Sequence, residues 1–263
     1  MLKCCSLYSG SSGNSFFIQS DNSNILVDVG VSIKKIQSAL NEKFNLSLDN
    51  IDAIFITHEH VDHTKSLFQI ASKYDMPIFA TFGTWHALEL QNKPINNKNT
   101  FILNKSFNFK DLRIYPFPTP HDAEEPCGFN IYNHNSKISI ATDIGYIDEN
   151  LFNHLKESSF IMLESNYEPQ MLKFSTYPYI LKRRISGNLG HLSNDDAGNT
   201  ISKLISYGLK DALLIHLSKE NNMPEIAYQN VMEKLNSCNQ NTENFHLSIA
   251  PRNNPSVIFD IKN

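Results

Sequence analysis

Thr57-His58-Glu59-His60-Val61-Asp62-His63 is the stretch of this sequence that decides the fold. It follows residues 51–56, a β-branched and aromatic run that predicts a strand, and it precedes a predicted helix over residues 64–74. Imidazole and carboxylate groups on such a loop suit zinc, manganese or iron. His58 and His60 point the same way in an extended segment, whereas Asp62 and His63 belong to the turn and face a different point. The spacing therefore indicates two metal ions rather than one.

The alternative interpretation of this stretch is a solvated, histidine-rich loop without a ligand role. Four candidate ligands within residues 58–63, directly after a buried-type strand, favour the metal site instead. The cysteines form no C-x-x-C pair, so neither a structural zinc site nor a disulfide framework is expected, and we interpret them as small core residues. They are Cys4, Cys5, Cys127 and Cys238.

The composition is that of an ordinary globular protein, with 263 residues, 41% hydrophobic and 19% charged. No run approaches the roughly 18 apolar residues that span a membrane, and the N-terminus lacks a secretory segment. We therefore expect a cytoplasmic protein with no membrane partner, folded as one domain over residues 1–263. A net charge of −4 does not indicate nonspecific DNA binding, which is usually the property of a basic domain.

The order of expected elements predicts an α/β fold with two sheets sandwiched between helices. Each half of the chain has a run of strands followed by mixed strand and helix units. The expected strands span residues 2–8, 15–19, 25–29, 51–56, 77–80, 112–117, 128–132, 137–141, 159–163, 211–215, 245–249 and 257–259. The expected helices span residues 32–40, 64–74, 83–90, 179–185, 194–207 and 224–235.

Three further metal ligands are expected where an apolar strand runs into a polar residue, because loops at strand ends present side chains. These candidates are His121, Asp143 and His216. For any one of them alone, a structural histidine or a turn aspartate is about as good an interpretation. Asp28, which also ends a strand, is a candidate to support the metal loop from behind by accepting an imidazole N–H.

Three other features are candidates for contact with a substrate. The residues Ser11, Ser12 and Asn14 belong to a Gly/Ser loop that is either an anion-binding nest or a plain turn. The basic run Lys182-Arg183-Arg184 is either a phosphate clamp or a solvated surface. His191 precedes a helix rather than following a strand, and it competes with His216 for the role of metal ligand. We therefore assign it proton transfer to the leaving oxygen or a hydrogen bond to the phosphate, with a role beside a helix cap as the alternative.

The His-x-His-x-Asp-His pattern resembles that of the metallo-β-lactamase superfamily, and the order of the later candidates matches its other motifs. This resemblance supports one metal held by His58, His60 and His121 and a second held by Asp62, His63 and His216. Asp143 is then expected to bridge the two ions. A shared water, deprotonated near neutral pH, would attack phosphorus, with Asp62 counted among the catalytic residues.

Longer stretches resemble the YycJ/WalJ (VicX) branch of this superfamily over nearly the whole chain. They are residues 9–14, 121–126, 163–166, 177–178, 181–184, 190–194 and 216–222. The resemblance implies a four-layer αββα fold, a dinuclear metal site, substrate contacts that include Asn166, and a cytoplasmic bacterial 5′→3′ DNA exonuclease linked to mismatch repair. It also suggests a tie to a cell-wall two-component system. The branch commonly has His-Asp where this chain has Tyr167-Glu168, and often Cys where it has Ser15.

Three functions follow from these patterns. The first is a dinuclear nuclease that acts on DNA. The second keeps the same chemistry on small nucleotides or cyclic phosphates, which the net charge of −4 favours slightly. The third is a regulatory module with a vestigial site, and the intact set of ligands argues against it. A lactamase or thioester hydrolase is compatible with the fold alone, but the basic run gives it no support.

Overall fold

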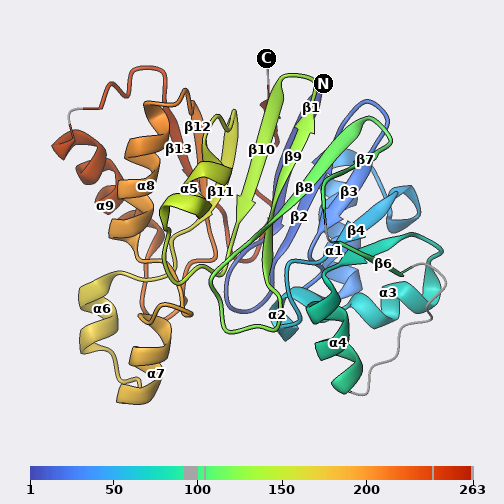
Figure 1. The fold of residues 1–263 in the computed structure, drawn as a ribbon, viewed down its shortest axis with the longest axis horizontal. Coiled ribbons are helices and arrows are strands. Elements are labelled where there is room, and N and C mark those ends of the chain that lie inside the picture. Colours follow the sequence, from blue (N-terminus) through green and yellow to red (C-terminus); the bar gives the residue numbers. More distant parts are fainter. Residues whose placement is uncertain (92–99, 104, 239, 262–263) are drawn as a thin grey trace.

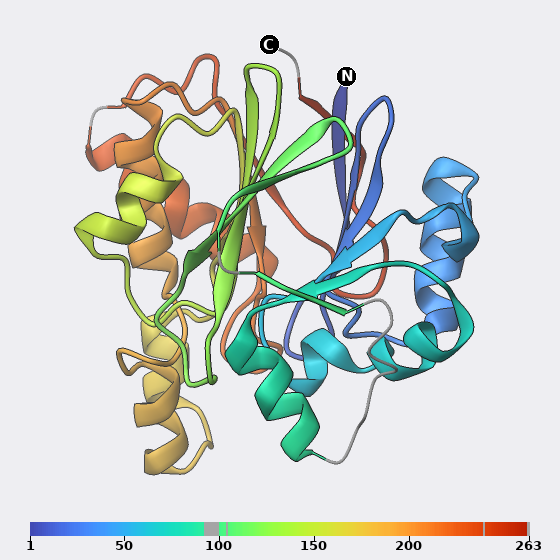
Figure 2. The ribbon, with the colours of Figure 1, turned by 45° about the vertical axis from the view of Figure 1, so that its right-hand side comes forward.

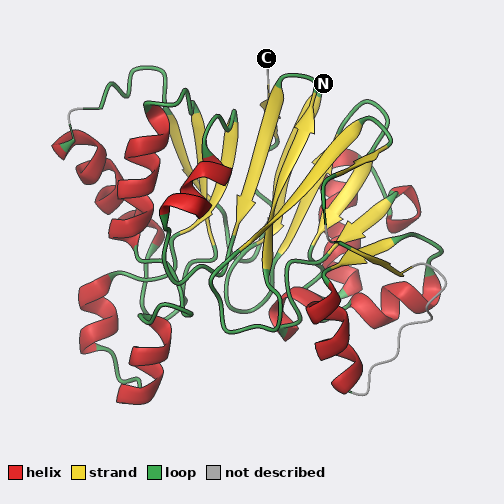
Figure 3. Ribbon diagram, viewed as in Figure 1, coloured by secondary structure: helices red, strands yellow, loops and turns green. Residues whose placement is uncertain are grey.

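Two mixed β-sheets lie face to face in the centre of the molecule, and helices cover their outer faces (Figure 1). The computed structural model describes residues 1–91, 100–103, 105–238 and 240–261. Figure 3 shows the strands packed between two groups of helices. This is the predicted α/β architecture with four αββα layers.

The first sheet has the strand order β14-β1-β2-β3-β4-β5-β6, and the second has the order β13-β12-β11-β10-β9-β8-β7. Both are antiparallel on one side and parallel on the other; β3 to β6 and β10 to β13 run parallel. The first sheet comprises β1 Leu2–Tyr8, β2 Ser15–Gln19, β3 Asn24–Val27, β4 Ala53–Phe55, β5 Ile78–Ala80, β6 Thr100–Ile102 and β14 Phe259–Ile261. The second comprises β7 Phe107–Phe109, β8 Leu112–Pro118, β9 Cys127–Asn133, β10 Ser136–Ala141, β11 Phe160–Glu164, β12 Asp211–Ile215 and β13 His246–Ile249.

The helices occupy the connections between strands. They are α1 Ile33–Phe44, the short 3₁₀ helix η1 Leu48–Asn50, α2 Val61–Thr64, α3 Leu67–Lys73, α4 Phe82–Leu90, α5 Glu149–Leu155, α6 Pro169–Phe174, α7 Tyr179–Ile185, α8 Asn194–Ile205 and α9 Pro224–Ser237. The turned view in Figure 2 separates α1, α3 and α4, beside the first sheet, from α5, α8 and α9, beside the second. In the part of the chain that is described, no helix has the length and apolar character needed to cross a bilayer.

Apolar side chains fill three layers, one between the sheets and one under each group of helices. Between the sheets, Phe16 and Phe55 from the first sheet meet Phe129 and Phe160 from the second, and all four are buried. Outside the first sheet, Phe17 and Leu26 pack with helical residues such as Ile36. The strands are therefore buried on both faces, which is why they appear in the sequence as nearly continuous apolar runs.

Several predicted elements differ from the observed ones. The helix expected over residues 64–74 is two helices, α2 and α3, and the first begins earlier, at Val61. The break has a tertiary cause, because the backbone N–H of Ser66 donates to the carbonyl oxygen of Val29 and its hydroxyl donates to that of Val31. Asp62 and His63 therefore lie in a helix rather than in a turn. The last strand, β14, lies two residues later in the chain than the strand predicted over 257–259. The elements β6, β7, α5, α6 and η1 were not expected.

Candidate active site

Polar side chains from the carboxyl ends of several strands meet at one edge of the sandwich. His58 follows β4, His121 follows β8, Asp143 follows β10 and His216 follows β12. In Figure 1 this edge is the lower one, where α2 lies. Because the loops of both sheets converge there, residues far apart in the sequence become neighbours.

His58, His60 and His121 form one group of candidate ligands, whose ligand atoms all lie within 4.8 Å of one another. The Nε2 atom of His121 is 3.3 Å from Nδ1 of His60. Backbone and hydroxyl oxygens orient the rings from behind: His58 Nδ1 lies 3.0 Å from the Thr57 hydroxyl, and His121 Nδ1 lies 3.0 Å from the carbonyl of Gly190. The free ring nitrogens of His58 and His121 therefore face the interior of the group.

Asp62, His63 and His216 form the second group. The Oδ2 atom of Asp62 lies 3.7 Å from His63 Nε2 and 3.5 Å from His216 Nε2. Buried carboxylates hold the opposite sides of both rings, since Asp28 Oδ2 is 2.7 Å from His63 Nδ1 and Glu164 Oε1 is 2.8 Å from His216 Nδ1. Asp28 also accepts hydrogen bonds from the backbone and hydroxyl of Thr57. The structure thus places Asp28 where an imidazole N–H can donate to it.

Asp143 lies between the two groups. Its Oδ2 atom is 3.2 Å from His63 Nε2, and its Oδ1 atom is 3.6 Å from His121 Nε2. One side chain therefore reaches a histidine of each group, while remaining almost fully buried.

These residues fit divalent metal ions. The Nε2 atoms of His58 and His216 are buried and have no hydrogen-bond partner among the described residues, although a buried polar atom normally has one. Imidazole rings whose other nitrogen is held by a carboxylate, hydroxyl or carbonyl oxygen are typical of metal sites, because that contact fixes the tautomer and the ring orientation.

The charges in the cluster are strongly coupled. Burial, followed by the neighbouring charge of His63, lowers the pKa of His58 well below its usual value. Burial opposes the protonation of His63 and His216, but nearby carboxylates, led by Asp143, raise the pKa of His63 well above its usual value and that of His216 to about 10. The buried carboxylates are therefore stable in their charged form only when positive charge lies beside them, and either protons on the histidines or metal ions can supply that charge.

Three residues of the site adopt left-handed backbone conformations one or two positions after a strand ends. Their φ angles are 61° for Asp28, 56° for Asp143 and 56° for His216. Positive φ is uncommon outside glycine, and it often marks functional sites whose surroundings hold the conformation in place. Each strand therefore ends abruptly and turns its last polar side chain into the cluster.

Glu164 is a site residue that the sequence analysis missed. It is fully buried at the end of β11, and its Oε1 atom lies 2.8 Å from both His191 Nδ1 and His216 Nδ1. Its Oε2 atom accepts hydrogen bonds from the backbone N–H groups of Ile144 and Leu192. The signal was present in the sequence, because Glu164 ends an apolar strand just as Asp143 and His216 follow one.

His191 lies at the rim of the cluster, with its side chain 19% exposed. Glu164 holds its Nδ1 atom, so Nε2 is the ring nitrogen left for other contacts. Burial opposes protonation of His191, but Glu164 outweighs this effect and raises the pKa of the ring. The ring is near both groups, at a centroid distance of 5.3 Å from His121 and from His216.

The residues predicted to contact a substrate differ in their exposure to solvent. Ser11 and Ser12 are exposed at the tip of their loop, whereas Asn14 is buried, with its amide nitrogen 3.1 Å from His63 Nε2 and its oxygen accepting from the backbone N–H of Gly10. Asn166 is also buried, and its amide donates to the carbonyl of His216. Asn14 and Asn166 therefore hold the loops of the site in position.

The basic run divides into three different environments. Lys182 Nζ donates to the carbonyls of Lys173 and Ser175, and Arg184 forms a 2.6 Å ion pair with Asp122. The guanidinium of Arg183 lies over the ring of Tyr179, 5.9 Å from its centroid. The run is thus neither a uniform phosphate clamp nor a freely solvated face.

The cysteines are partly as expected. The side chains of Cys4, Cys5 and Cys127 are buried, but Cys238, just after α9, is exposed, which the sequence interpretation had wrong. Burial raises the pKa of the Cys127 thiol, so this residue stays protonated, and it belongs to none of the candidate metal groups among the described residues.

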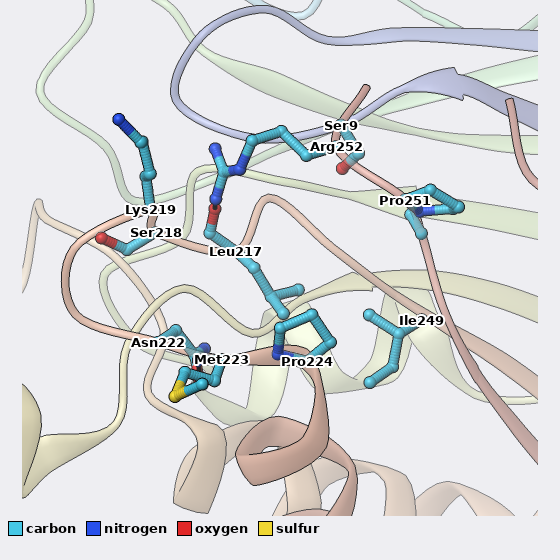
Figure 4. Close-up of a pocket in the computed structure, with 11 residues that line it drawn as sticks. Ser9, Leu217, Ser218, Lys219, Asn222, Met223, Pro224, Ile249, Pro251 and Arg252 are labelled. Atoms are coloured by element: carbon cyan, nitrogen blue, oxygen red, sulfur yellow. Dashed lines mark hydrogen bonds between the residues drawn. The ribbon is translucent and has the colours of Figure 1, made fainter. Parts of the chain in front are cut away.

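A pocket of about 480 Å³ is lined by Leu217, the residue after His216, and by side chains of the neighbouring loops (Figure 4). Arg252 lines it and donates a hydrogen bond to the carbonyl of Leu217, the residue after His216. Ser9, also in the lining, accepts a hydrogen bond from the His216 backbone N–H. The loop before α9, the loop after β13 and the loop after β1 therefore support His216 together.

Comparison with known proteins agrees with this geometry. The beta-lactamase superfamily domain matches residues 23–217. Exodeoxyribonuclease YycJ of Bacillus anthracis is 36% identical over 231 residues, 87% of each chain. Exodeoxyribonuclease WalJ of Streptococcus pneumoniae is 36% identical over 233 residues, 87% of this chain and 86% of that one.

A solved structure, the metallo-beta-lactamase fold protein YhfI of Bacillus subtilis, superimposes with a TM-score of 0.69 at 15% identity, covering 97% of this chain and 98% of that one. At this low identity, the similarity concerns the fold alone. The domain match, the extent of the identity and the His/Asp cluster lead to one conclusion: the chain belongs to the YycJ/WalJ branch of the metallo-β-lactamase superfamily and is a metal-dependent hydrolase.

Proposed function

We propose that this protein is a dinuclear metal-dependent phosphodiesterase that degrades DNA from its ends with 5′→3′ polarity. The observation that carries the proposal is the position of Asp143, whose two oxygens reach His63 and His121, one from each group of ligands. A single carboxylate in that position is suited to two ions about 3.5–4 Å apart, the spacing of two-metal sites that act on phosphates.

In this proposal, His58, His60 and His121 would hold one ion, Asp62, His63 and His216 would hold the other, and Asp143 would serve both. Such a pair of ions supplies a nucleophile from water near neutral pH and neutralises charge on phosphate oxygens. Zinc, manganese and iron all suit this set of nitrogen and oxygen ligands.

The protein's own residues have separate tasks. Asp28 and Glu164 keep the rings of His63 and His216 oriented by accepting from their Nδ1 atoms. His191, held by Glu164 at one nitrogen, presents the other at the rim, where it can give a proton to the leaving oxygen of a phosphodiester. His191 also belongs, with Asp143, Glu164 and His216, to a further group of candidate metal ligands, but its partly exposed position at the rim supports the proton-transfer role.

The similarity to two proteins named exodeoxyribonuclease, each over 87% of this chain, supports DNA as the substrate. A link to mismatch repair, a cytoplasmic location and a tie to a cell-wall two-component system stay predictions from the resemblance.

The experiment that tests this function is a nuclease assay on duplex DNA labelled at either the 5′ or the 3′ end. The protein is first stripped of metal by a chelator and then supplied with zinc, manganese or iron, one at a time. We expect no cleavage after chelation, recovery with at least one metal, early release of the 5′ label and progressive shortening of the 3′-labelled strand. The variants Asp62→Ala and His63→Ala serve as inactive controls.

Other results would lead to other functions. Hydrolysis of a small phosphodiester, with long DNA left intact under every metal, would favour the small-nucleotide phosphodiesterase. Early loss of a 3′ label with a stable 5′ label would reverse the proposed polarity, and cleavage that persists in Asp62→Ala would contradict the site itself.

A further inference from the structure

The helices α6 and α7 form a hairpin that extends from the same edge of the molecule as the metal cluster. Figures 1 and 2 both show this hairpin at the edge where α2 lies. Two contacts attach it to the site: the backbone N–H of His191 donates to the carbonyl of Ile185, at the end of α7, and Arg184 pairs with Asp122, whose other oxygen lies 3.3 Å from His121 Nε2. The hairpin is therefore a wall of the active-site region.

A pocket of about 610 Å³ lies between the two helices. This volume is within the roughly 300–1,000 Å³ of small-molecule pockets. Three tyrosines and three cations belong to its lining: Tyr167, Tyr177, Tyr179, Lys173, Lys182 and Arg183. Tyr167 is buried and forms the inner wall, whereas Tyr179 is 72% exposed at the mouth. The pocket thus combines flat apolar surface with positive charge, and no carboxylate lines it.

The cations of the pocket are not neutralised by carboxylates of the described residues, and one of these cations, Arg183, lies over a tyrosine ring of the lining. Within the described ranges, none of Lys173, Lys182 and Arg183 forms an ion pair. Arg183 lies over Tyr179, and Lys182 is held by carbonyl oxygens at the turn between the helices. A flat, uncharged ligand attached to an anionic chain matches this combination better than an acidic peptide does, because only the former uses the exposed ring face.

We propose that the α6–α7 pocket receives an unpaired base of the DNA strand whose phosphate lies at the metal cluster. The inference rests on the proposed function and adds to it how the strand is gripped. Aromatic rings that stack on bases, beside cations that follow the backbone, are how proteins hold single-stranded nucleic acid without reading its sequence. The pocket would hold a base from a single strand or from a frayed duplex end.

The test is the affinity of the metal-loaded protein for a fluorescent single-stranded oligonucleotide with phosphorothioate linkages, which resist cleavage. We expect Tyr179→Ala to weaken binding by about 5- to 150-fold, the range for the loss of one stacked base, and Tyr179→Phe to bind like the wild type. Tyr179 is exposed, so neither change threatens the fold. Tyr228→Ala, at a tyrosine of α9 that is 42% exposed, is the matched control and should bind normally.

A second measurement locates the base. One abasic residue is moved stepwise along the oligonucleotide, and the position that weakens wild-type binding should have no further effect in Tyr179→Ala. Equal affinity of the wild type and Tyr179→Ala, or independent effects of the two changes, would overturn the inference. Binding to anionic vesicles is measured in parallel, because the same rings and cations could contact a lipid surface. If Tyr179→Ala lost vesicle binding but kept DNA binding, the inference would also be wrong. Failure of the wild type to cleave natural DNA with any metal would instead refute the proposed function.

Discussion

Asp143 is the residue that we propose to join the two groups of metal ligands. Asparagine tolerates the left-handed conformation at this position and has nearly the same volume, so Asp143→Asn removes the charge without adding backbone strain. Since metal ions stabilise the transition state by several kcal/mol, we expect kcat/KM to fall by at least about 100-fold, with a metal content below two per chain and a normal circular dichroism spectrum. Steady-state kinetics and plasma mass spectrometry measure both effects. Near-normal activity with two bound metals would contradict the bridging role.

Glu164 offers an independent test at the same scale, because it contacts both His191 and His216 and is not one of the proposed ligands of either ion. Glu164→Gln keeps the shape and removes the charge. Loss of such a supporting carboxylate typically costs about 10- to 100-fold in metal affinity or activity, and we expect a change in that range from metal titration. Asp111→Asn, at a carboxylate that accepts hydrogen bonds from Ser20 and Ser23, is the control and should leave metal affinity unchanged. Unaltered affinity in Glu164→Gln would assign this residue to the fold alone.

Several candidate residues of the site were recognisable in the sequence because they follow an apolar strand, as His121 and Asp143 do, and because their order resembles that of the superfamily's motifs. The contacts that these residues make could not be predicted. The order of residues does not indicate that Asn166 faces the protein interior or that Arg184 pairs with Asp122. Both contacts are made between loops that meet only in the folded chain. The roles of the ligands therefore stay proposals, supported by the geometry.

At the scale of elements, the short helix α2 is the part that carries Asp62 and His63, and the loops after β1 and β3 hold it. The backbone N–H of Val29 donates to the carbonyl of His63, and that of Asn14 donates to the carbonyl of Asp62. The sequence predicted one helix here because the apolar spacing is helical. The tertiary hydrogen bonds of Ser66 override that spacing, and no local pattern reveals them.

Gly30 is the position where this packing is closest. A Cβ atom there would lie 1.6 Å from the carbonyl oxygen of Asp62, so α2 must move to accept any side chain. We expect Gly30→Ala to lower the free energy of unfolding by about 1–3 kcal/mol and to weaken metal binding, measured by denaturant titration and calorimetry. Gly198→Ala, inside α8, is the control: a Cβ atom there would lie 3.0 Å from Lys234 Cβ and 3.3 Å from Val231 Cα, so it tightens the packing of α8 against α9 but should leave metal affinity unchanged. Wild-type metal affinity in Gly30→Ala would contradict the tight coupling of α2 to this loop.

At the scale of the whole molecule, the proposed ions would join the two sheets. His58, His60, Asp62 and His63 come from the half of the chain that forms the first sheet, and the remaining candidate ligands come from the second. Each metal ion that binds only the folded chain, at about 100 times its Kd, stabilises it by about 2.7 kcal/mol, so two independent ions stabilise it by about 5.4 kcal/mol. Because about 1 kcal/mol shifts Tm by about 2–4 °C for chains of about 150–250 residues, chelation should lower Tm by about 10–20 °C. A Tm that does not respond to chelator and metal would argue against a site shared by both halves.

The layered architecture was predictable because strand runs followed by mixed units recur in both halves of the sequence. The pairing of strands was not, because it depends on contacts distant in sequence: β14 at the end of the chain pairs with β1 at its beginning. The α6–α7 pocket also escaped prediction, since α6 was not expected and its wall forms only when Tyr167 packs under the hairpin. Treatment of the chain as one domain stays a prediction from its length and pattern.

The most direct test of the dinuclear site is anomalous X-ray diffraction from crystals of the metal-loaded protein, recorded at the absorption edge of the metal. The geometry predicts two peaks in each molecule, one among His58, His60 and His121 and the other among Asp62, His63 and His216, with Asp143 between them. A single peak, or peaks located away from these side chains, would contradict it.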